Sequence, residues 1–368
     1  MKKIFTLLFI LNSLLSPAQP LPDNFYKRFE GTINDKYNIT LNLVRIDSAL
    51  TGNYYYNNRG ELINFIRSSM DNIGNIYLEE DAGYDENYNS VTTGIFKGRF
   101  ITDSRIEGIW EKPDGSKKMA FYLDEKYPEG SVRTDIFHYS RTYTNYGQAS
   151  IDITNIEIKN YIKADIQDSI NSRLSNAVLQ GITFDESKTY TTTDDLMDDF
   201  INTYITTVVS DSVNYTDYIP RYEYNCITKI LYNSDYLLSL KKIDYSFLGG
   251  AHPNTFIEFL NFDLNSGKLL QLDDIFKHGY NEILNKTGEL KFREYFQLEA
   301  DEPLDSAGFW FENGFQLNEN FTLTKAGILF LFNAYEIGPY VLGAPEVYIP
   351  FSEIKELIKE DSIVGFIQ

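Results

Sequence analysis

Apolar and polar residues alternate along short stretches in the first third of the chain. In residues 37–43 every second residue is apolar, and residues 118–123 repeat this pattern. A period of two is typical of strands that bury one face. Turn-forming segments such as Asn57–Gly60 and Pro113–Gly115 separate the strands. We therefore predict that residues 22–127 form an all-β accessory domain, a meander or small barrel of roughly seven or eight strands.

The hydrophobic period changes after the turn-forming segment Tyr127–Ser131, where we place a domain boundary. Apolar residues then recur at every fourth position, at Ile162, Ile166, Ile170, Leu174 and Val178. This period predicts a helix that is capped by Asn160 and ends near Gly181. A second helix is predicted to begin at Thr193, because two aspartates follow it and carboxylates favour the positive end of a helix.

Apolar stretches that predict strands dominate the rest of the chain. They are residues 222–232, 236–247, 254–264, 327–332 and 346–351. We predict a helical insert over residues 280–297 and a terminal helix over residues 352–359. The expected protein is multi-domain: the N-terminal meander or barrel is followed by an α+β module with an antiparallel sheet and flanking helices. We divide that module into the regions 131–225 and 226–368.

The turn between the strands 236–247 and 254–264 carries the most distinctive motif, Gly-Gly-Ala-His-Pro-Asn. Glycine adopts backbone conformations that let a ligand or another chain segment approach closely. Gly249, Gly250, His252 and Asn254 are therefore candidate ligand-binding residues. The alternative is that His252 is a structural histidine that ties the hairpin to its sheet.

A second candidate segment, Tyr335–Tyr340, supplies Tyr335, Glu336 and Tyr340. Glu336 is the acid that we expect near His252, and the two together would suit acid–base hydrolysis. The sequence contains no HExxH motif, nucleophile elbow or phosphate-binding loop. We therefore assign no catalytic residue, metal or cofactor, and expect a binding role.

Residues 1–18 have the pattern of a signal peptide: two lysines, an apolar run and a small-residue exit. The apolar run is too short to span a bilayer. We expect a protein that is exported to the periplasm or the medium, soluble after cleavage and without a transmembrane anchor. The single cysteine, Cys226, allows no intramolecular disulfide and is expected to be a small buried hydrophobe.

The chain is strongly acidic, with a formal net charge of −20. Such a charge repels phosphate, so nucleic acid and anionic lipid are not expected partners. The charge suits a basic partner, or it serves only to keep an exported protein in solution.

Several motifs in the second half of the chain resemble the bacterial family of unknown function DUF3298. They are Gly249–His252, Phe262–Lys268, Leu272–Phe276, Phe321–Ile328 and Tyr335–Tyr340. The preceding region, residues 135–225, is similar to DUF4163, the usual partner of that family. The resemblance covers residues 135–360 and leaves the N-terminal domain outside.

This resemblance implies a module of the cell envelope. Members include the extracellular sensor of lysozyme-responsive anti-sigma factors and the accessory half of a peptidoglycan deacetylase. We see neither a spanning helix nor a polysaccharide-deacetylase domain in the sequence, so sigma-factor signalling and deacetylation are not expected. The expected partner is a peptidoglycan fragment or a basic wall-active protein such as lysozyme. The alternatives are a cell-wall hydrolase that uses His252 and Glu336, and a structural scaffold of the envelope.

Overall fold

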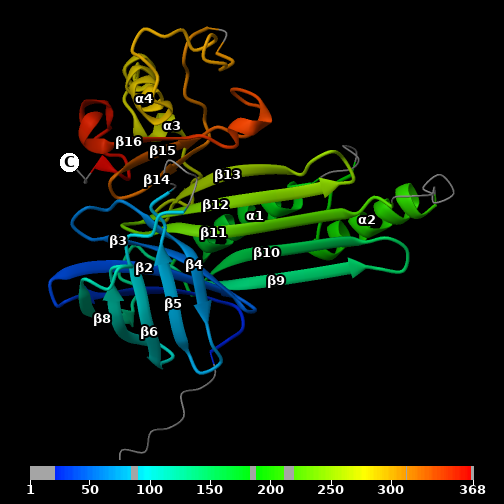
Figure 1. The fold of residues 1–368 in the computed structure, drawn as a ribbon, viewed down its shortest axis with the longest axis horizontal. Helices are drawn as coiled ribbons and strands as arrows, with labels where there is room; N and C mark the ends of the chain where they lie inside the picture. Colours follow the sequence, from blue (N-terminus) through cyan, green and yellow to red (C-terminus); the bar gives the residue numbers. More distant parts are fainter. Residues whose placement is uncertain (1–20, 84–89, 183–187, 211–218, 312, 366–368) are drawn as a thin grey trace, which may run out of the picture.

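The computed structural model describes residues 21–365 except 84–89, 183–187, 211–218 and 312. The predicted signal peptide lies outside the described residues. The described chain forms a closed barrel, a five-stranded sheet and a three-stranded sheet (Figure 1). No helix in these ranges has the length and apolar character needed to cross a membrane.

The N-terminal barrel has eight antiparallel strands in sequential order, which confirms the predicted meander. Its strands are β1 (Phe25–Ile33), β2 (Tyr37–Ile46), β3 (Ala49–Tyr56), β4 (Ile63–Met70), β5 (Asn75–Glu80), β6 (Ile95–Thr102), β7 (Arg105–Glu111) and β8 (Lys118–Glu125). The barrel closes where β1 pairs with β8. Gly31 is required at this seam, because a Cβ there would lie 1.9 Å from the carbonyl oxygen of Tyr122. Alternating apolar side chains such as Phe29, Leu41 and Phe121 fill the interior.

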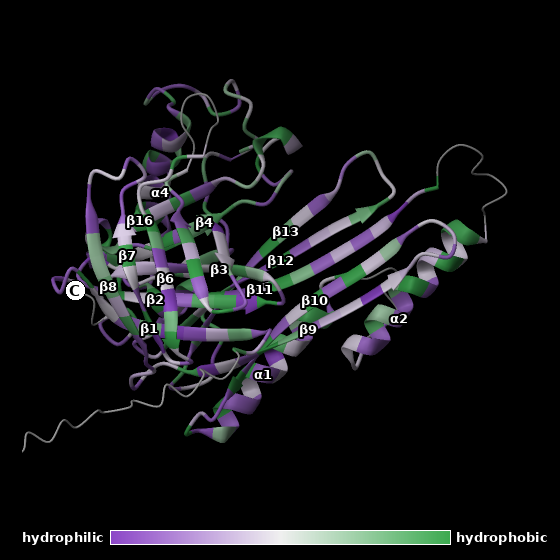
Figure 2. Ribbon diagram, turned by 60° about the horizontal axis from the view of Figure 1, so that its bottom comes forward, coloured by the Kyte–Doolittle hydropathy of each residue, from purple (hydrophilic) through white to green (hydrophobic). Residues whose placement is uncertain are grey.

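The central sheet has the strand order β13-β12-β11-β10-β9. Its strands are β9 (Arg133–Tyr143), β10 (Ala149–Lys159), β11 (Tyr222–Ser234), β12 (Leu237–Leu248) and β13 (Asn254–Asp263). The helices α1 (Ala164–Leu179) and α2 (Thr193–Tyr204) cover one face of this sheet, and the π-helical turn η1 (Ile205–Val209) extends α2 (Figure 2). We expected an antiparallel sheet, but β10 and β11 are parallel. The reason is that the chain crosses over through both helices between these strands.

The helix boundaries show how local chemistry sets an N-terminus. Asn160, the predicted cap of α1, lies in a left-handed turn at φ 54°. The helix instead begins at Ala164, after Lys163, whose side chain makes no capping bond. The predicted start of the second helix near Thr193 is confirmed, and Thr192 is the cap of α2. The Thr192 hydroxyl accepts a hydrogen bond from the backbone nitrogen of Asp195, and the Asp195 carboxylate accepts one from the backbone nitrogen of Thr192.

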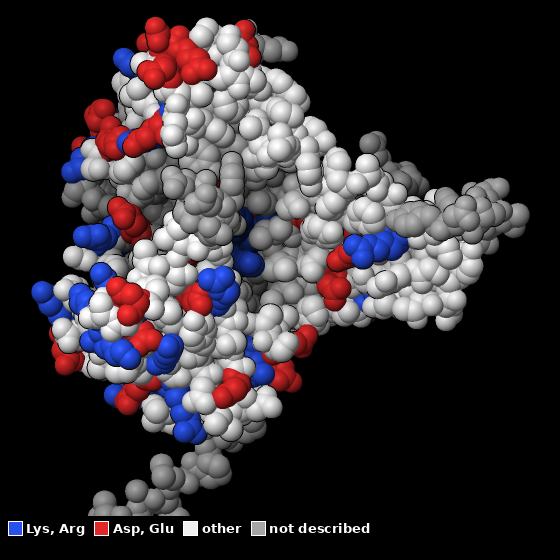
Figure 3. Space-filling model, in the orientation of Figure 1, with Lys and Arg blue, Asp and Glu red and all other residues white. Residues whose placement is uncertain are grey.

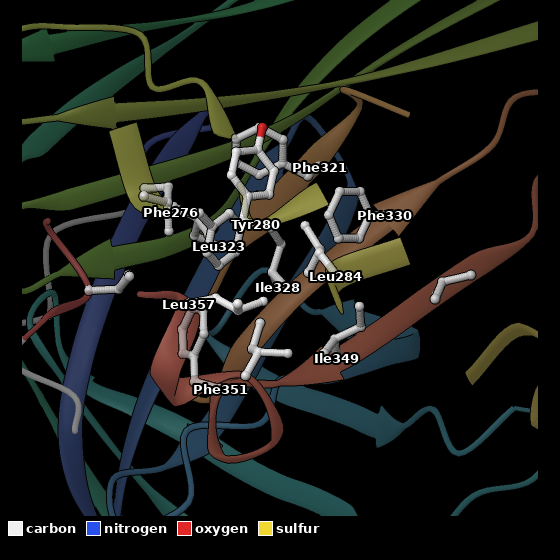
Figure 4. Packing of buried hydrophobic residues seen from close by; sticks show 14 of the residues in the cluster. Phe276, Tyr280, Leu284, Phe321, Leu323, Ile328, Phe330, Ile349, Phe351 and Leu357 are labelled. Atoms are coloured by element: carbon white, nitrogen blue, oxygen red, sulfur yellow. The ribbon is translucent and has the colours of Figure 1, made fainter. Parts of the chain in front are cut away.

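The C-terminal part forms a small sheet backed by helices. Its elements are α3 (Leu272–Ile275), α4 (Asn281–Phe296), β14 (Phe321–Leu323), β15 (Gly327–Leu331) and β16 (Glu346–Pro350). Figure 4 shows apolar side chains of these elements, among them Leu284, Phe330 and Ile349, packed into one core. This core and the helix α4 agree with the predicted helical insert.

The terminal helix predicted over residues 352–359 does not form. The chain makes 3-10 turns instead, η4 (Phe351–Glu353) and η5 (Lys355–Leu357), after an earlier one, η3 (Tyr340–Leu342). Ile354 lies between η4 and η5 at φ −132° and is fully buried. Ile358 then pairs with Phe276 as an isolated β-bridge. Burial of these side chains against the core therefore overrides the local helical preference.

A buried polar network joins the barrel to the central sheet. The Arg28 guanidinium, which is 2% exposed, donates to the carbonyl of Asn233 at 2.9 Å and to the hydroxyl of Ser234 at 2.7 Å. The amides of Asn42 and Asn53 reach backbone carbonyls of β11 from the barrel side. These bonds hold the barrel against the end of β11.

Candidate functional site

The predicted hairpin between β12 and β13 forms, and its tip meets the segment after β15. The His252 ring stacks on Tyr340, with ring centroids 4.2 Å apart and an interplanar angle of 26°. The Tyr340 hydroxyl donates to the carbonyl of Pro253 at 3.0 Å. We name His252, Tyr335 and Tyr340 the ring cluster, because Tyr335 also lies beside both partners, with centroids at 6.2 and 5.6 Å.

The hydrogen bonds of His252 define its tautomer. Its Nδ1 lies 2.8 Å from the carbonyl oxygen of Pro253, which can only accept. Nδ1 therefore donates, and the Nε2 of a neutral ring accepts from the Tyr335 hydroxyl at 3.1 Å. Both rings face solvent, and Tyr335 is 50% exposed.

Tyr335 is held in a left-handed backbone conformation at φ 68°. A bulky residue adopts this region only when its surroundings enforce it, and such strain is frequent at binding sites. Here the turn is enforced by Asn333 and Glu336: the nitrogen of Glu336 donates to the carbonyl of Asn333 at 3.0 Å, and the nitrogen of Asn333 donates to the Glu336 carboxylate at 2.7 Å. The turn therefore points the Tyr335 ring outward.

The Glu336 carboxylate accepts hydrogen bonds within this turn and none from His252. Its second carboxylate oxygen accepts from the side-chain amide of Asn318 at 2.7 Å. The hydrogen bonds of His252 go to Pro253 and Tyr335. The structure thus brings His252 together with Tyr335 and Tyr340, while Glu336 shapes the loop.

The other candidate residues form the hairpin turn itself. Gly249 has φ 77°, and a Cβ there would lie 2.7 Å from the side chain of Pro220, so glycine is needed. A Cβ at Gly250 would meet nothing within 4 Å, so no steric need for glycine is seen there. Asn254 is exposed and pairs with Ser246 at the start of the β12–β13 ladder. These three residues position the ring cluster.

A second feature, which the sequence did not reveal, is a cleft of about 660 Å³ between the barrel, the central sheet and the small sheet. Figure 3 shows a hollow between barrel and sheet with basic side-chain atoms inside it. Lys229 of β11 and Lys241 of β12 line the cleft and are direct cross-strand partners. The signal in the sequence was a lysine next to buried residues in each of two strands.

The two lysines of the cleft differ in their partners. The Lys241 ammonium lies 3.5 Å from the Glu346 carboxylate and 5.6 Å from the centroid of the Phe259 ring. For Lys229, no carboxylate partner lies within ion-pair distance in the described part of the chain. Burial, and then the charge of Lys241, lower the pKa of Lys229.

Cys226 lies on the opposite face of the central sheet and is fully buried, as predicted. Burial, and then the nearby Asp244 carboxylate, raise the pKa of its thiol, so it is a poor nucleophile. Across the described ranges, no three His, Cys, Asp or Glu side chains converge as a metal-ligand set.

Two segments of the chain match known protein families. Residues 273–352 match the family described as "Protein of unknown function (DUF3298)", and residues 140–255 match "Deacetylase PdaC". Peptidoglycan-N-acetylmuramic acid deacetylase PdaC of Bacillus subtilis (strain 168) is 26% identical over 147 residues, or 39% of this chain. The matched segment spans 31% of that protein's length.

Two solved structures of DUF3298 family proteins are similar to part of this chain. One from Bacteroides fragilis NCTC 9343 superposes with a TM-score of 0.57 at 23% identity, covering 64% of this chain and 97% of its own. One from Pseudomonas aeruginosa PAO1 gives a TM-score of 0.47 at 18% identity, covering 62% and 94%. The first of these likenesses shows a common fold.

The predicted DUF3298 domain is therefore confirmed at the C-terminal end, and Tyr335–Tyr340 lies inside it. The hairpin motif Gly249–His252, which we expected in the same family, lies in the segment that matches PdaC. The ring cluster thus joins residues from both matched segments. The similarity to DUF4163 and to anti-sigma-factor sensors stays a prediction.

Proposed function

We propose that this protein is an exported cell-envelope binding module that recognises a peptidoglycan fragment through the ring cluster. The observation that carries the proposal is the exposed, stacked arrangement of His252, Tyr335 and Tyr340. Aromatic faces offer apolar area to the faces of sugar rings, and their hydroxyl groups orient a polar ligand. The likeness of residues 140–255 to a protein named as a peptidoglycan deacetylase supports this class of ligand.

The ring cluster is organised before any ligand arrives. The turn of Asn333 and Glu336 holds Tyr335, and the hydrogen bonds of His252 and Tyr340 hold the hairpin tip against it. Rings that are already oriented lose little conformational entropy on binding, which favours affinity.

A basic wall-active protein such as lysozyme is the second candidate partner. The observation that favours it is the net charge of −20, which attracts a basic protein over a long range. Such binding weakens steeply with added salt, whereas stacking of a muropeptide on aromatic rings does not.

The hydrolase alternative needs His252 and Glu336 in contact with one substrate bond. Their separate hydrogen-bond partners favour a binding role for this surface. The scaffold alternative predicts envelope crosslinks but no muropeptide affinity. We keep the division into residues 22–127, 131–225 and 226–368 as part of this proposal, with the barrel as the accessory domain.

Calorimetric titration of the full chain with muropeptides and with lysozyme, at low and at physiological salt, tests the proposal. We expect muropeptide binding that Tyr335→Ala weakens about tenfold, the usual loss for an aromatic anchor. Tyr295→Ala is the matched control, since Tyr295 is 60% exposed on α4 and outside the cluster. Absence of binding to both ligands at low salt would refute the proposal.

A further inference from the structure

We infer that the cleft between the barrel and the two sheets is a second binding site, which holds a zwitterionic amino acid or short peptide with its carboxylate on Lys229 and Lys241. This goes beyond the proposed function, because the cleft and the ring cluster are separate surfaces. From Lys241 to its end at Leu248, the strand β12 runs roughly 23 Å at the usual rise per residue.

The lysine pair is the reason to expect an anion. Like charges that face each other directly across two strands destabilise a sheet. Lys229 and Lys241 occupy such positions in the β11–β12 register. Among the described residues, ion-pair contact with this pair comes only from the Glu346 carboxylate, which lies 3.5 Å from Lys241. A ligand carboxylate between the two lysines gives Lys229 the counter-charge that it lacks among the described residues.

The acidic residues of the cleft decide between an anion and a zwitterion. Glu61 and Asp81 of the barrel side line the same cleft. Together with Glu346, these carboxylates repel a phosphate or a polyanion, and they suit an ammonium group on the ligand. A molecule with both charges, such as a free amino acid or a short peptide, complements both the lysines and the acidic residues of the cleft.

Size and preorganisation agree with a ligand of this class. A volume of about 660 Å³ lies within the range of small-molecule sites. Apolar side chains, including Phe65, Ile243 and Leu329, line the space between the charged walls. The buried Arg28 network holds the barrel against β11, so the cleft exists without a ligand.

The test is calorimetric titration of the full chain with three probes: alanyl-alanine, its C-terminal amide and its N-acetyl form, each as the L,L and D,D isomers. We expect alanyl-alanine to bind, and its affinity to fall at least tenfold when either terminus is blocked. Lys229→Gln and Lys241→Gln are expected to weaken binding at least tenfold. Lys117→Gln, which removes the same charge from an exposed barrel turn, is the control and should bind normally.

Three results would overturn the inference: no binding by any probe, equal binding of the amide, or normal binding by both lysine variants. Lys229→Met keeps the test independent of folding, because loss of the like-charge pair leaves the melting temperature of the free protein unchanged or higher. Tyr335→Ala should leave dipeptide binding intact. The experiment can therefore refute dipeptide binding by the cleft without refuting ligand binding by the ring cluster.

Discussion

Lys242 and Asp244 form an ion pair on the helix-facing side of the central sheet. The ammonium nitrogen and a carboxylate oxygen are 2.6 Å apart, and the side chains are 4% and 6% exposed. The Tyr224 hydroxyl donates to the same carboxylate at 2.6 Å. A charge buried this deeply is tolerated only with its partner.

Lys242→Met should therefore lower the free energy of unfolding by about 3–5 kcal/mol, because it leaves the Asp244 carboxylate buried with no counter-charge. Urea denaturation of the variant measures the effect. The double variant Lys242→Met, Asp244→Leu should recover most of the loss. A single variant as stable as the parent would contradict the assignment.

For Lys229 we predict the opposite effect on stability. Burial, and then Lys241, lower its pKa below the usual 10.5, so the folded state disfavours the proton that the unfolded state binds. Stability should rise with pH from the lowered pKa up to about 10.5. Lys229→Met removes one of two facing charges and should stabilise the protein at pH 7 by roughly 0.2–1 kcal/mol.

Melting temperatures of the parent and of Lys229→Met between pH 7 and 10.5 check this prediction. The difference in melting temperature between the two proteins should become smaller as the pH rises, because the parent loses the charge that the variant lacks. A constant gap would mean that Lys229 titrates as it does in the unfolded chain.

At the scale of elements, polar side chains determine where helices begin. Sequence periodicity located both helices of the central sheet and the acidic start of α2, but Ile162, the first residue of the predicted stripe, lies before α1 and is 93% exposed. The same reasoning failed at Asn160, because asparagine is favoured both as a cap and in left-handed turns. The choice at Asn160 depends on its position at the end of β10.

Thr192→Ala should cost about 1 kcal/mol by removing the reciprocal cap with Asp195. Chemical denaturation is the measurement, and Thr192→Ser, which keeps the hydroxyl, is the matched control. Equal losses in both variants would show that the methyl group, and not the cap, matters.

At the scale of the whole molecule, Arg28 links the barrel to the central sheet. Its guanidinium also donates to the carbonyl of Lys126 at 2.7 Å and to Glu30 at 2.9 Å. The position of the barrel determines the shape of the cleft, since barrel residues form one of its walls.

Arg28→Met should lower stability by about 2–3 kcal/mol, because buried carbonyl groups lose a charged donor. It should also weaken any dipeptide affinity of the cleft. Arg105→Met is the control: Arg105 is 44% exposed on the barrel, and its loss should change stability by no more than about 0.5 kcal/mol. Denaturation and calorimetry on both variants test the link.

At the candidate site, the sequence motifs located the segments, but the contacts between them were seen only in the structure. Sequence motifs located the hairpin and the segment Tyr335–Tyr340, and the structure joins them as the ring cluster. They also paired His252 with Glu336, which lies in the neighbouring turn and bonds elsewhere. Adjacent residues of a tight turn point in different directions, so proximity in sequence did not predict contact.

By itself, the sequence determined the barrel strands, the hairpins, both helices of the central sheet and the buried state of Cys226. These features depend on hydrophobic period and turn chemistry, which are local. The tertiary structure alone decided the closure of β1 on β8, the parallel pair β10–β11 and the cleft. Each of these brings together segments that are far apart in the chain, and local patterning specifies which face of a strand is buried but not which partner covers it.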